Sequence, residues 1–479
     1  MTKVIEETAL TFDDVLLVPQ MSEILSRSAV DTRTKIGGLQ LNIPIISANM
    51  DTVTEWKMAE AMARLGGIGI IHRFMTIEDQ VRQVERVKRA ENTIIRNPVK
   101  ILPDITLAQA REVMAQYSIS GLMVVDGSNH LVGILTRRDM LFRPDSTLVK
   151  ECMTGLDALV YAQDNITPQA AKALLMERRI EKLPLVNQSG ELVGLITVKD
   201  IVEQETNPNA SRDVDGNLLV GAAIGTKAED IDRCEALSRA GVDIIVIDIA
   251  HGHSRHTLNV VREIRQKYPE MIIVAGNVAT YDGTLDLLKS GADVVKVGVG
   301  SGSICITRIV TGFGVPQLTA IMESARACQD YGKGEIIADG GVRVAGDIVK
   351  ALAAGAQAVM VGSLVSGTDE APGRPVVKDG QRFKVIRGMA SVSANIARKQ
   401  VDKIPVTEDT FDQIVPEGVE ALVPYKGAVN EIIYQMVGGL RSGLSYAGAR
   451  NIRELEQNAV FVKITPAGKV ESGAHDVES

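Results

Sequence analysis

The chain has 479 residues, which is too long for one ordinary hydrophobic core and predicts two or more domains. Hydrophobic residues make up 45% of the chain and aromatic residues only 3%, so we expect a core of aliphatic side chains on buried parallel strands. The net charge of -8 and the lack of a dense basic stretch argue against nucleic acid as the main partner, and no apolar run is long enough to span a membrane.

The N-terminus has no signal-peptide pattern, and the four cysteines lie far apart without metal-ligand spacing. We therefore expect reduced thiols and a cytoplasmic location. These properties suit an enzyme that acts on small molecules, and they suit many binding proteins equally well.

Short apolar or β-branched runs alternate with helical stretches along most of the chain. Eight such runs separated by helices are typical of a parallel (β/α)8 barrel, the TIM barrel, so the predicted fold class is α/β. The expected strands cover residues 43–47, 67–71, 218–223, 243–248, 271–275, 293–297, 335–339 and 358–362. The barrel would comprise residues 1–95 and 208–479.

An internal repeat lies between the second and third expected strands. Residues 131–139 recur as residues 192–200, 61 residues later. Each copy is expected to form a helix, a strand, a turn, a second strand and the start of another helix. The segment 96–207 resembles a tandem cystathionine-β-synthase (CBS, or Bateman) module, with repeats at about 96–149 and 150–207.

Cys305 lies in a glycine-rich loop that follows the sixth expected strand. A lone cysteine is usually a small buried side chain or an inert thiol. The glycine and serine neighbours indicate an exposed loop, and Arg308 supplies a positive charge that favours a thiolate. Since active sites of TIM barrels lie at the C-terminal ends of the strands, Cys305 is a candidate nucleophile.

Glycine-rich segments also follow the last two expected strands, at Asp339–Gly341 and Gly362–Ser363. In TIM barrels this position often binds phosphate through backbone N–H groups. The simpler interpretation is loop closure, because glycine tolerates tight turns. Two such segments on adjacent strands favour a phosphate site.

The chain resembles the IMP dehydrogenase/GMP reductase family over almost its whole length. The segments that carry this resemblance are residues 10–17, 49–55, 298–308, 338–343, 387–389 and 423–427. In that family a cysteine adds to carbon 2 of a purine nucleotide, and hydride passes between that carbon and a nicotinamide, which implies NAD or NADP as the cofactor. The resemblance also implies a homotetramer or an octamer.

The resemblance assigns the remaining site residues. The catalytic residues would be Cys305, Thr307 and Glu417. The purine monophosphate would contact Ser303, Asp339, Gly340, Gly341, Gly362, Ser363, Arg387, Gly388, Met389 and Glu417, and the nicotinamide pocket would include Asp248, Gly298, Val299 and Gly300. A potassium ion would bind Gly300, Gly302 and Cys305 together with the partner subunit's Glu471, the partner subunit's Ser472 and the partner subunit's Gly473.

The direction of the reaction depends on the flap, at about residues 390–420. Dehydrogenases hydrolyse the intermediate with an Arg-Tyr pair, which residues 394–405 lack; Arg398 followed by Lys399 is the nearest pair. Ile386 and Ala390 also replace the family's usual tyrosine and glycine.

A general base contributes roughly 100- to 10,000-fold in rate, so its loss matters. Reductases release ammonia instead of adding water, and Thr307 and Glu417 suit that step, although dehydrogenases have both residues too. The sequence therefore favours GMP reduction to IMP and ammonia. IMP oxidation to XMP is the alternative, which residues 50–55, residues 250–254 and the repeat favour. A nucleotide sensor with an inactive barrel is a remote alternative.

Each repeat contains a Thr-x-x-Asp pattern after its second expected strand, formed by Thr136 with Asp139 and by Thr197 with Asp200. In a CBS module this pattern contacts the ribose of an adenine or guanine nucleotide, so the resemblance predicts regulation by nucleotides. The same pattern is also a common helix N-cap. Both roles are compatible.

Overall fold

The computed structural model describes residues 4–90, 95–96, 98–117, 119–401 and 415–473, except for the side chains of residues 168, 200, 203 and 204. The chain divides into two compact units. The first unit comprises Met1–Lys88, Asn209–Asp213 and Leu218–Ser479, and the second comprises Arg89–Pro208 and Val214–Asn217. The second unit therefore contains the whole of the predicted module, residues 96–207, whose identity as a CBS pair stays a prediction.

The first unit is built on a closed barrel of eight parallel strands in the order β13-β14-β15-β16-β17-β18-β4-β5. The strands are β4 (Ile45–Ser47), β5 (Ile68–Ile71), β13 (Val220–Ile224), β14 (Ile244–Asp248), β15 (Ile272–Val278), β16 (Val294–Val297), β17 (Glu335–Asp339) and β18 (Ala358–Val361). Each one overlaps an expected strand, so the predicted TIM barrel is confirmed. The expected ends differ from the observed ones by a few residues.

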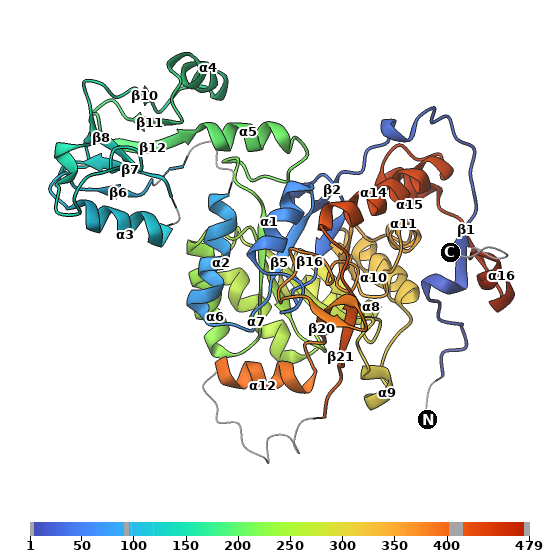
Figure 1. Cartoon of the computed structure of the whole chain (residues 1–479). Helices are drawn as coiled ribbons and strands as arrows, with labels where there is room; N and C mark the ends of the chain where they lie inside the picture. Colours follow the sequence, from blue (N-terminus) through green and yellow to red (C-terminus); the bar gives the residue numbers. More distant parts are fainter. Residues whose placement is uncertain (1–3, 91–94, 97, 118, 402–414, 474–479) are drawn as a thin grey trace. The chain divides into compact units, whose positions relative to one another are not determined.

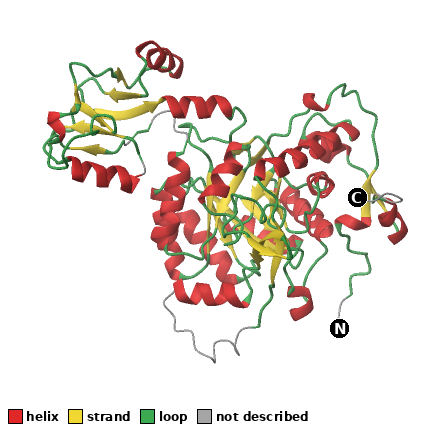
Figure 2. Ribbon diagram, in the orientation of Figure 1, coloured by secondary structure: helices red, strands yellow, loops and turns green. Residues whose placement is uncertain are grey.

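Helices surround the strands of the barrel, as Figure 2 shows. They are α1 (Trp56–Arg64), α2 (Ile77–Arg89), α6 (Ala228–Arg239), α7 (Arg255–Lys267), α8 (Tyr281–Ser290), α10 (Gln317–Tyr331) and α11 (Ala345–Ala353). Local sequence fixes several of their ends. The Thr280 side chain caps the first turn of α8, and Gly291 ends the helix with a left-handed φ of 110°.

The chain after β18 adds further elements to the first unit (Figure 1). A three-stranded antiparallel sheet contains β19 (Val376–Lys378), β20 (Gln381–Arg387) and β21 (Glu420–Pro424), with α12 (Val392–Val401) between the last two. Helices α14 (Val429–Tyr446), α15 (Ile452–Asn458) and α16 (Pro466–Glu471) follow.

The segment before the barrel pairs with the C-terminal part of the chain. Strand β1 (Val15–Leu17) lies antiparallel to β22 (Phe461–Lys463), and the short helix η1 (Phe12–Asp14) precedes it. Helix η2 (Arg27–Ala29) and the hairpin of β2 (Thr34–Ile36) and β3 (Leu39–Leu41) lead into the barrel.

The second unit shows the repeat as matching elements 61 residues apart. The first copy has α3 (Leu107–Tyr117), β7 (Gly121–Val125) and β8 (Leu131–Thr136), and the second has α4 (Pro168–Arg178), β11 (Lys182–Val186) and β12 (Leu192–Thr197). Both hairpins carry an irregularity at the equivalent step, Val124/Val125 and Leu185/Val186. Strands β6 (Lys100–Ile101) and β9 (Thr154–Gly155) flank the first hairpin, β10 (Ala162–Gln163) flanks the second, and η3 (Val149–Glu151) lies between the two copies.

One expected element of the repeat is missing from the first copy. The second copy continues into α5 (Val198–Thr206), but residues 137–142 form turns instead of a helix. Phe142 has a left-handed φ of 60°, and Pro144 disfavours helical backbone at the residue before it. The prediction of a helix there is wrong because it considered the repeat and not this proline.

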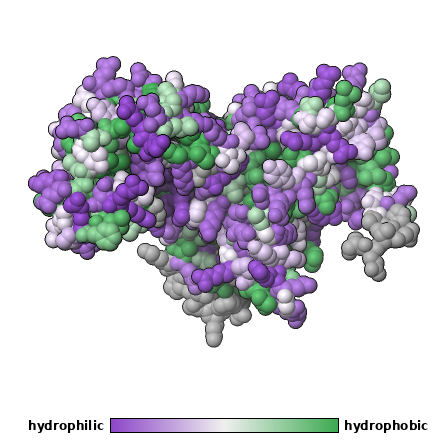
Figure 3. All heavy atoms as spheres, turned by 45° about the horizontal axis from the view of Figure 1, so that its top comes forward, coloured by the Kyte–Doolittle hydropathy of each residue, from purple (hydrophilic) through white to green (hydrophobic). Residues whose placement is uncertain are grey.

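Among the described residues, no helix has the length and apolar character needed to cross a membrane. The face drawn in Figure 3 is mostly hydrophilic, with hydrophobic residues in small groups.

Candidate functional site

The loop that carries Cys305 follows β16 at the C-terminal end of the barrel. Its glycines are needed for close packing. At Gly298 the backbone φ is 149°, and a Cβ atom would lie 2.0 Å from the carbonyl oxygen of Asp339. At Gly300, with a φ of 76°, a Cβ atom would lie 2.6 Å from Cγ of Arg308. Side chains at either position would push the loop away from the barrel.

Cys305, Thr307 and Glu417 form a continuous chain of polar contacts. The Cys305 Sγ atom lies 3.1 Å from the Thr307 hydroxyl, which donates a 2.8 Å hydrogen bond to Oε2 of Glu417. Cys305 is partly exposed, so a ligand can reach the sulfur. The thiol, hydroxyl and carboxylate are therefore aligned to pass a proton.

Backbone pairing brings Glu417 to this position across 110 residues of sequence. The Ile306 N–H donates to the Glu417 carbonyl at 2.8 Å, and the Val419 N–H donates to the Ile304 carbonyl at 3.0 Å. Cys305 and Gly418 form an isolated antiparallel bridge between these two bonds. The segment that leads into β21 is thus fixed against the cysteine loop.

The other three cysteines are poor nucleophiles. Burial raises the pKa of Cys152, and it raises the pKa of Cys234 and of Cys328 to about 12. A thiol with such a pKa stays protonated at neutral pH. Of the four cysteines, Cys305 is the one in contact with a hydroxyl and carboxylate pair.

A buried lysine that the sequence analysis missed lies at the centre of the site. Lys296, in β16, is only 2% exposed, and its Nζ lies 2.8 Å from Oδ1 of Asp248 and 2.6 Å from Oδ2 of Asp339. Asn277 donates to Asp339 Oδ2 at 2.9 Å and also contacts Lys296. The Lys296 ammonium group thus pairs with both Asp248, a predicted cofactor residue, and Asp339, a predicted nucleotide residue.

The charges in this cluster stabilise one another. Burial alone would raise the pKa of Asp248, but the charge and hydrogen bond of Lys296 hold it below its ordinary value. Burial alone would lower the pKa of Lys296, but the carboxylates of Asp248 and Asp339 raise it. Asp248 and Lys296 are therefore both charged at neutral pH. A lysine within the run Val294–Val297 is the one sequence signal for this cluster.

Most of the predicted nucleotide residues lie on loops beside Cys305. The hydroxyls of Ser303 and Ser363 are 3.0 Å apart, which joins the cysteine loop to the loop after β18. Gly340 and Gly341 follow β17 with left-handed φ values of 90° and 80°. Gly362 directly follows β18, where a Cβ atom would lie 3.2 Å from the Met50 sulfur.

The end of β20 approaches the cysteine loop through glycine contacts. A Cβ atom at Gly388 would lie 3.1 Å from Cα of Gly418 and 3.4 Å from the Ile304 carbonyl oxygen. Met389, the next residue, is partly exposed, and Ile386 is 1% exposed. An apolar side chain thus lies where the family's tyrosine was expected.

Arg387 is a further predicted nucleotide residue whose charge is paired, as that of Asp339 is. Its guanidinium pairs with Oδ2 of Asp51, with Nε at 2.8 Å, and its backbone N–H donates to the Thr52 hydroxyl at 3.2 Å. Asp51 raises the pKa of Arg387. Arg387 therefore fastens β20 to the segment after β4.

The four predicted cofactor residues lie around the Lys296 cluster and the start of the cysteine loop. Asp248 ends β14, and Gly298, Val299 and Gly300 follow β16 directly. Val299 is partly exposed. Glycines at which a Cβ would clash, next to a carboxylate, suit the close approach of a nicotinamide ribose.

The predicted potassium ligands in this chain are on two separate segments. The Gly302 carbonyl accepts a 3.1 Å hydrogen bond from the Cys305 N–H, and Glu471 ends α16, with Ser472 as its C-cap. Gly473 follows directly. The described residues contain no cluster of three or more His, Cys, Asp or Glu side chains that could hold a metal ion, but the predicted site consists mainly of carbonyl groups.

The predicted regulatory residues form a local cap in the first repeat. Both the backbone N–H and the hydroxyl of Thr136 donate to Oδ2 of Asp139 at 2.7 Å. In the second repeat Thr197 ends β12, and the side chain of Asp200 lies outside the described residues. In the flap, residues 402–414 also lie outside the described residues. They include the end of the stretch 394–405, where dehydrogenases have the Arg-Tyr pair.

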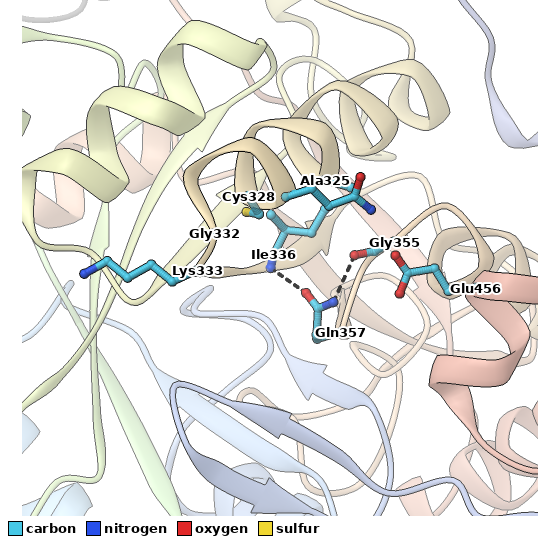
Figure 4. A pocket seen from close by; sticks show the side chains of 10 residues that line it. Ala325, Cys328, Gly332, Lys333, Ile336, Gly355, Gln357 and Glu456 are labelled. Atoms are coloured by element: carbon cyan, nitrogen blue, oxygen red, sulfur yellow. Dashed lines mark hydrogen bonds between the residues drawn. The ribbon is translucent and has the colours of Figure 1, made fainter.

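A separate cavity of about 350 Å³ lies near the N-terminal ends of β17 and β18, away from Cys305 (Figure 4). Gln357 spans its wall, accepting from the Ile336 N–H at 2.8 Å and donating to the Gly355 carbonyl at 3.1 Å. Burial raises the pKa of Cys328 to about 12 and also raises that of Glu456. Its lining thus offers no thiolate for chemistry.

Comparison with known proteins gives one consistent family. The model of the IMP dehydrogenase/GMP reductase domain matches residues 9–475. The chain is 52% identical over 470 residues to inosine-5'-monophosphate dehydrogenase of Nitrosopumilus maritimus, covering 98% of each protein. It is 53% identical over 473 residues to the enzyme of that name from Aquifex aeolicus, covering 98% of this chain and 96% of the relative.

A solved structure shows the same fold. A cysteine-to-alanine variant of GMP reductase from Trypanosoma brucei, in complex with guanosine 5'-monophosphate, superposes with a TM-score of 0.91 at 44% identity and covers 98% of both chains. The same reductase with guanosine 5'-triphosphate superposes with a TM-score of 0.80 at 39% identity.

These comparisons overturn the prediction of GMP reduction. Relatives that share about half of their residues with this chain over nearly its whole length are named IMP dehydrogenase. The prediction rested on the missing Arg-Tyr pair. That inference was wrong because it gave one missing residue pair more weight than the similarity that runs along almost the whole chain.

Proposed function

Since this chain belongs to the IMP dehydrogenase/GMP reductase family and is an oxidoreductase, we propose that it oxidises IMP to XMP with NAD as the hydride acceptor. The observation that carries the proposal is the contact chain from Cys305 through Thr307 to Glu417. It supports both formation of a covalent intermediate and its hydrolysis.

In the proposed reaction the Cys305 thiolate adds to carbon 2 of the purine, and hydride leaves that carbon. The product of this step is a thioimidate on the sulfur. Water then adds to the same carbon, the carbon–sulfur bond breaks, and XMP is released. Covalent attachment divides one difficult substitution into two easier steps. NAD, when bound, supplies the acceptor for the hydride.

Thr307 and Glu417 have the proposed role of activating the water. The Thr307 hydroxyl takes a proton from water as it passes its own proton to the Glu417 carboxylate, to which it already donates at 2.8 Å. After the carbon–sulfur bond breaks, the thiol is regenerated next to the same hydroxyl. This route requires no Arg-Tyr pair on the flap.

The binding sites are proposed from the residues around this centre. Asp339 would accept hydrogen bonds from the ribose hydroxyls, and the loops with Ser303 and Ser363 would bind the phosphate. The purine nucleotide set also includes Gly340, Gly341, Gly362, Arg387, Gly388, Met389 and Glu417. Asp248 and residues 298–300 would hold the nicotinamide nucleoside.

Further proposals follow from the family resemblance. A potassium ion would bind the carbonyl groups of Gly300, Gly302 and Cys305 together with residues 471–473 of a neighbouring subunit in a homotetramer or an octamer. Residues 96–207 would form a CBS pair that binds adenine or guanine nucleotides. ATP or GTP should then change the kinetics or the assembly of the enzyme, and the absence of both effects would remove this proposal.

The test of the function compares two reactions of the purified protein. IMP with NAD should give NADH and XMP, followed by NADH absorbance and product chromatography. GMP with NADH or NADPH is run beside it under the same conditions. NADH formation from IMP at a rate well above GMP reduction supports the proposal, and the reverse order contradicts it.

A further inference from the structure

Two lysines lie near the loop after β18, Lys426 partly buried and Lys384 buried, and each donates to backbone carbonyl groups. Lys426, two residues after β21, has its Nζ 2.8 Å from the carbonyl oxygens of Ser363 and Leu364. Lys384, in β20, donates to the Thr368 carbonyl at 2.8 Å and to the Ala371 carbonyl. The Lys426 ammonium thus contacts the predicted phosphate loop, whereas the Lys384 ammonium contacts the segment that follows it.

The backbone around Lys426 is held by hydrogen bonds against residues 367–369. The Lys426 N–H donates to the Gly367 carbonyl at 2.9 Å, and the Asp369 N–H donates to the Gly427 carbonyl at 2.9 Å. A Cβ atom at Gly367 would lie 2.3 Å from the Pro424 carbonyl oxygen, which shows how closely the two segments pack.

A nucleotide phosphate at this loop needs positive charge nearby, because its dianion is otherwise expensive to desolvate. The predicted phosphate contacts are hydroxyls and backbone N–H groups. Arg387 is paired with Asp51, and the buried Ile386 offers no hydroxyl. Within the described part of the chain, the Lys426 ammonium forms no ion pair. Burial lowers the pKa of Lys426, and a bound phosphate would oppose that shift.

We propose that Lys426 is the positioning residue of the phosphate subsite, holding the Ser363–Leu364 turn from behind and supplying the positive charge that the bound phosphate requires. It acts through the turn and not by contact with the purine. By fixing the Ser363 carbonyl, it also sets the place where the Ser363 hydroxyl meets that of Ser303, 3.0 Å away. This inference rests on the proposed function, because it takes IMP as the ligand.

The test separates phosphate binding from folding by comparing IMP with inosine, which lacks the phosphate. Dissociation constants are measured by calorimetry for IMP and by competition for inosine. All variants carry Cys305→Ala to prevent turnover. Lys426→Met and Lys426→Gln both remove the charge. Lys426→Gln keeps a hydrogen-bond donor, so it serves as the neutral variant if Lys426→Met does not fold. Lys426→Arg keeps the charge. Lys384→Met is the matched control, because Lys384 also donates to backbone carbonyl groups but does not contact Ser363.

The two neutral Lys426 variants should weaken IMP binding by roughly ten- to a hundredfold, the usual loss for a charged hydrogen bond, and leave inosine binding unchanged. Lys426→Arg should restore most of the IMP affinity. Lys384→Met should leave the ratio of the dissociation constants for IMP and inosine as it is in the Cys305→Ala protein. Equal weakening of IMP and inosine, or the same change of ratio in Lys384→Met, would overturn the proposal.

IMP oxidation by the wild-type preparation is measured in parallel, so that the two proposals fail separately. Absence of that turnover contradicts the proposed function. The phosphate dependence of IMP binding supports or overturns the role of Lys426 independently of turnover.

Discussion

Replacing Lys296 with methionine should damage both substrate subsites at once. The variant keeps the aliphatic part of the side chain but leaves the carboxylates of Asp248 and Asp339 without their shared cation. At an effective dielectric constant of about 20, each contact at 2.8 Å and 2.6 Å contributes about 6 kcal/mol before desolvation. Desolvation of the buried ammonium offsets much of this, so a net loss of about 3–5 kcal/mol is expected, as for other broken buried pairs.

The uncompensated carboxylates should respond by taking up a proton. Burial raises the pKa of Asp248 once the Lys296 ammonium no longer opposes it, so this carboxylate takes up a proton more readily than in the wild type. The Michaelis constants for IMP and NAD should therefore both rise in Lys296→Met, and kcat/KM should fall more steeply with decreasing pH than in the wild type. Lys296→Arg preserves the charge and should retain much of the activity.

The assay combines steady-state kinetics over a pH series with thermal unfolding of each variant. Coupled increases in both Michaelis constants, together with a lower unfolding temperature, would support the shared-cation arrangement. The reasoning is refuted if Lys296→Met unfolds at the wild-type temperature and keeps both Michaelis constants.

The remaining predictions concern the water step, the N-terminal segment and the cysteine loop. Glu417→Gln should lower IMP turnover by roughly 100- to 10,000-fold while leaving hydride transfer in the first turnover, measured by stopped-flow absorbance. Asp13 has its pKa lowered by Arg343 and Lys469, so it stabilises the fold above about pH 4 and less as pH falls further. Asp13→Asn should cost about 1 kcal/mol at neutral pH by chemical denaturation, with the difference from wild type shrinking below that pH, and an unchanging difference would contradict this. Gly298→Ala should abolish NAD binding in titrations, because its Cβ would lie 2.0 Å from a carbonyl oxygen of β17; normal binding would show that the loop can shift.

The barrel was predictable because its signal is local. Each strand is a short apolar run such as Ile244–Asp248. The alternation of these runs with helical stretches predicts the number of strands in the barrel. The sequence also predicts Cys305 as a candidate nucleophile, since it lies in an unusual glycine-rich loop, and that role stays a prediction. Glu417 was expected only from the family resemblance, because 110 residues separate it from Thr307 and backbone pairing brings the two together.

Features formed by distant residues could not be predicted in this way. Lys296 occupies one position of an apolar strand, and its partners come from three other strands, so only the closed barrel makes them neighbours. Arg387 and Asp51 are 336 residues apart, and their ion pair likewise forms only in the folded chain, between β20 and the segment after β4. The reaction direction was misjudged because a missing pair on the flap was weighed more heavily than the similarity along the rest of the chain.

The most direct measurement is rapid-quench mass spectrometry of the peptide that contains Cys305 while the wild type and Glu417→Gln turn over IMP and NAD. The account predicts a purine nucleotide adduct on Cys305 that forms and decays in the wild type fast enough to explain turnover. In Glu417→Gln the same adduct should accumulate, because its hydrolysis is slowed. Steady IMP oxidation without any adduct on Cys305, or an adduct that decays equally fast in both proteins, would contradict the account.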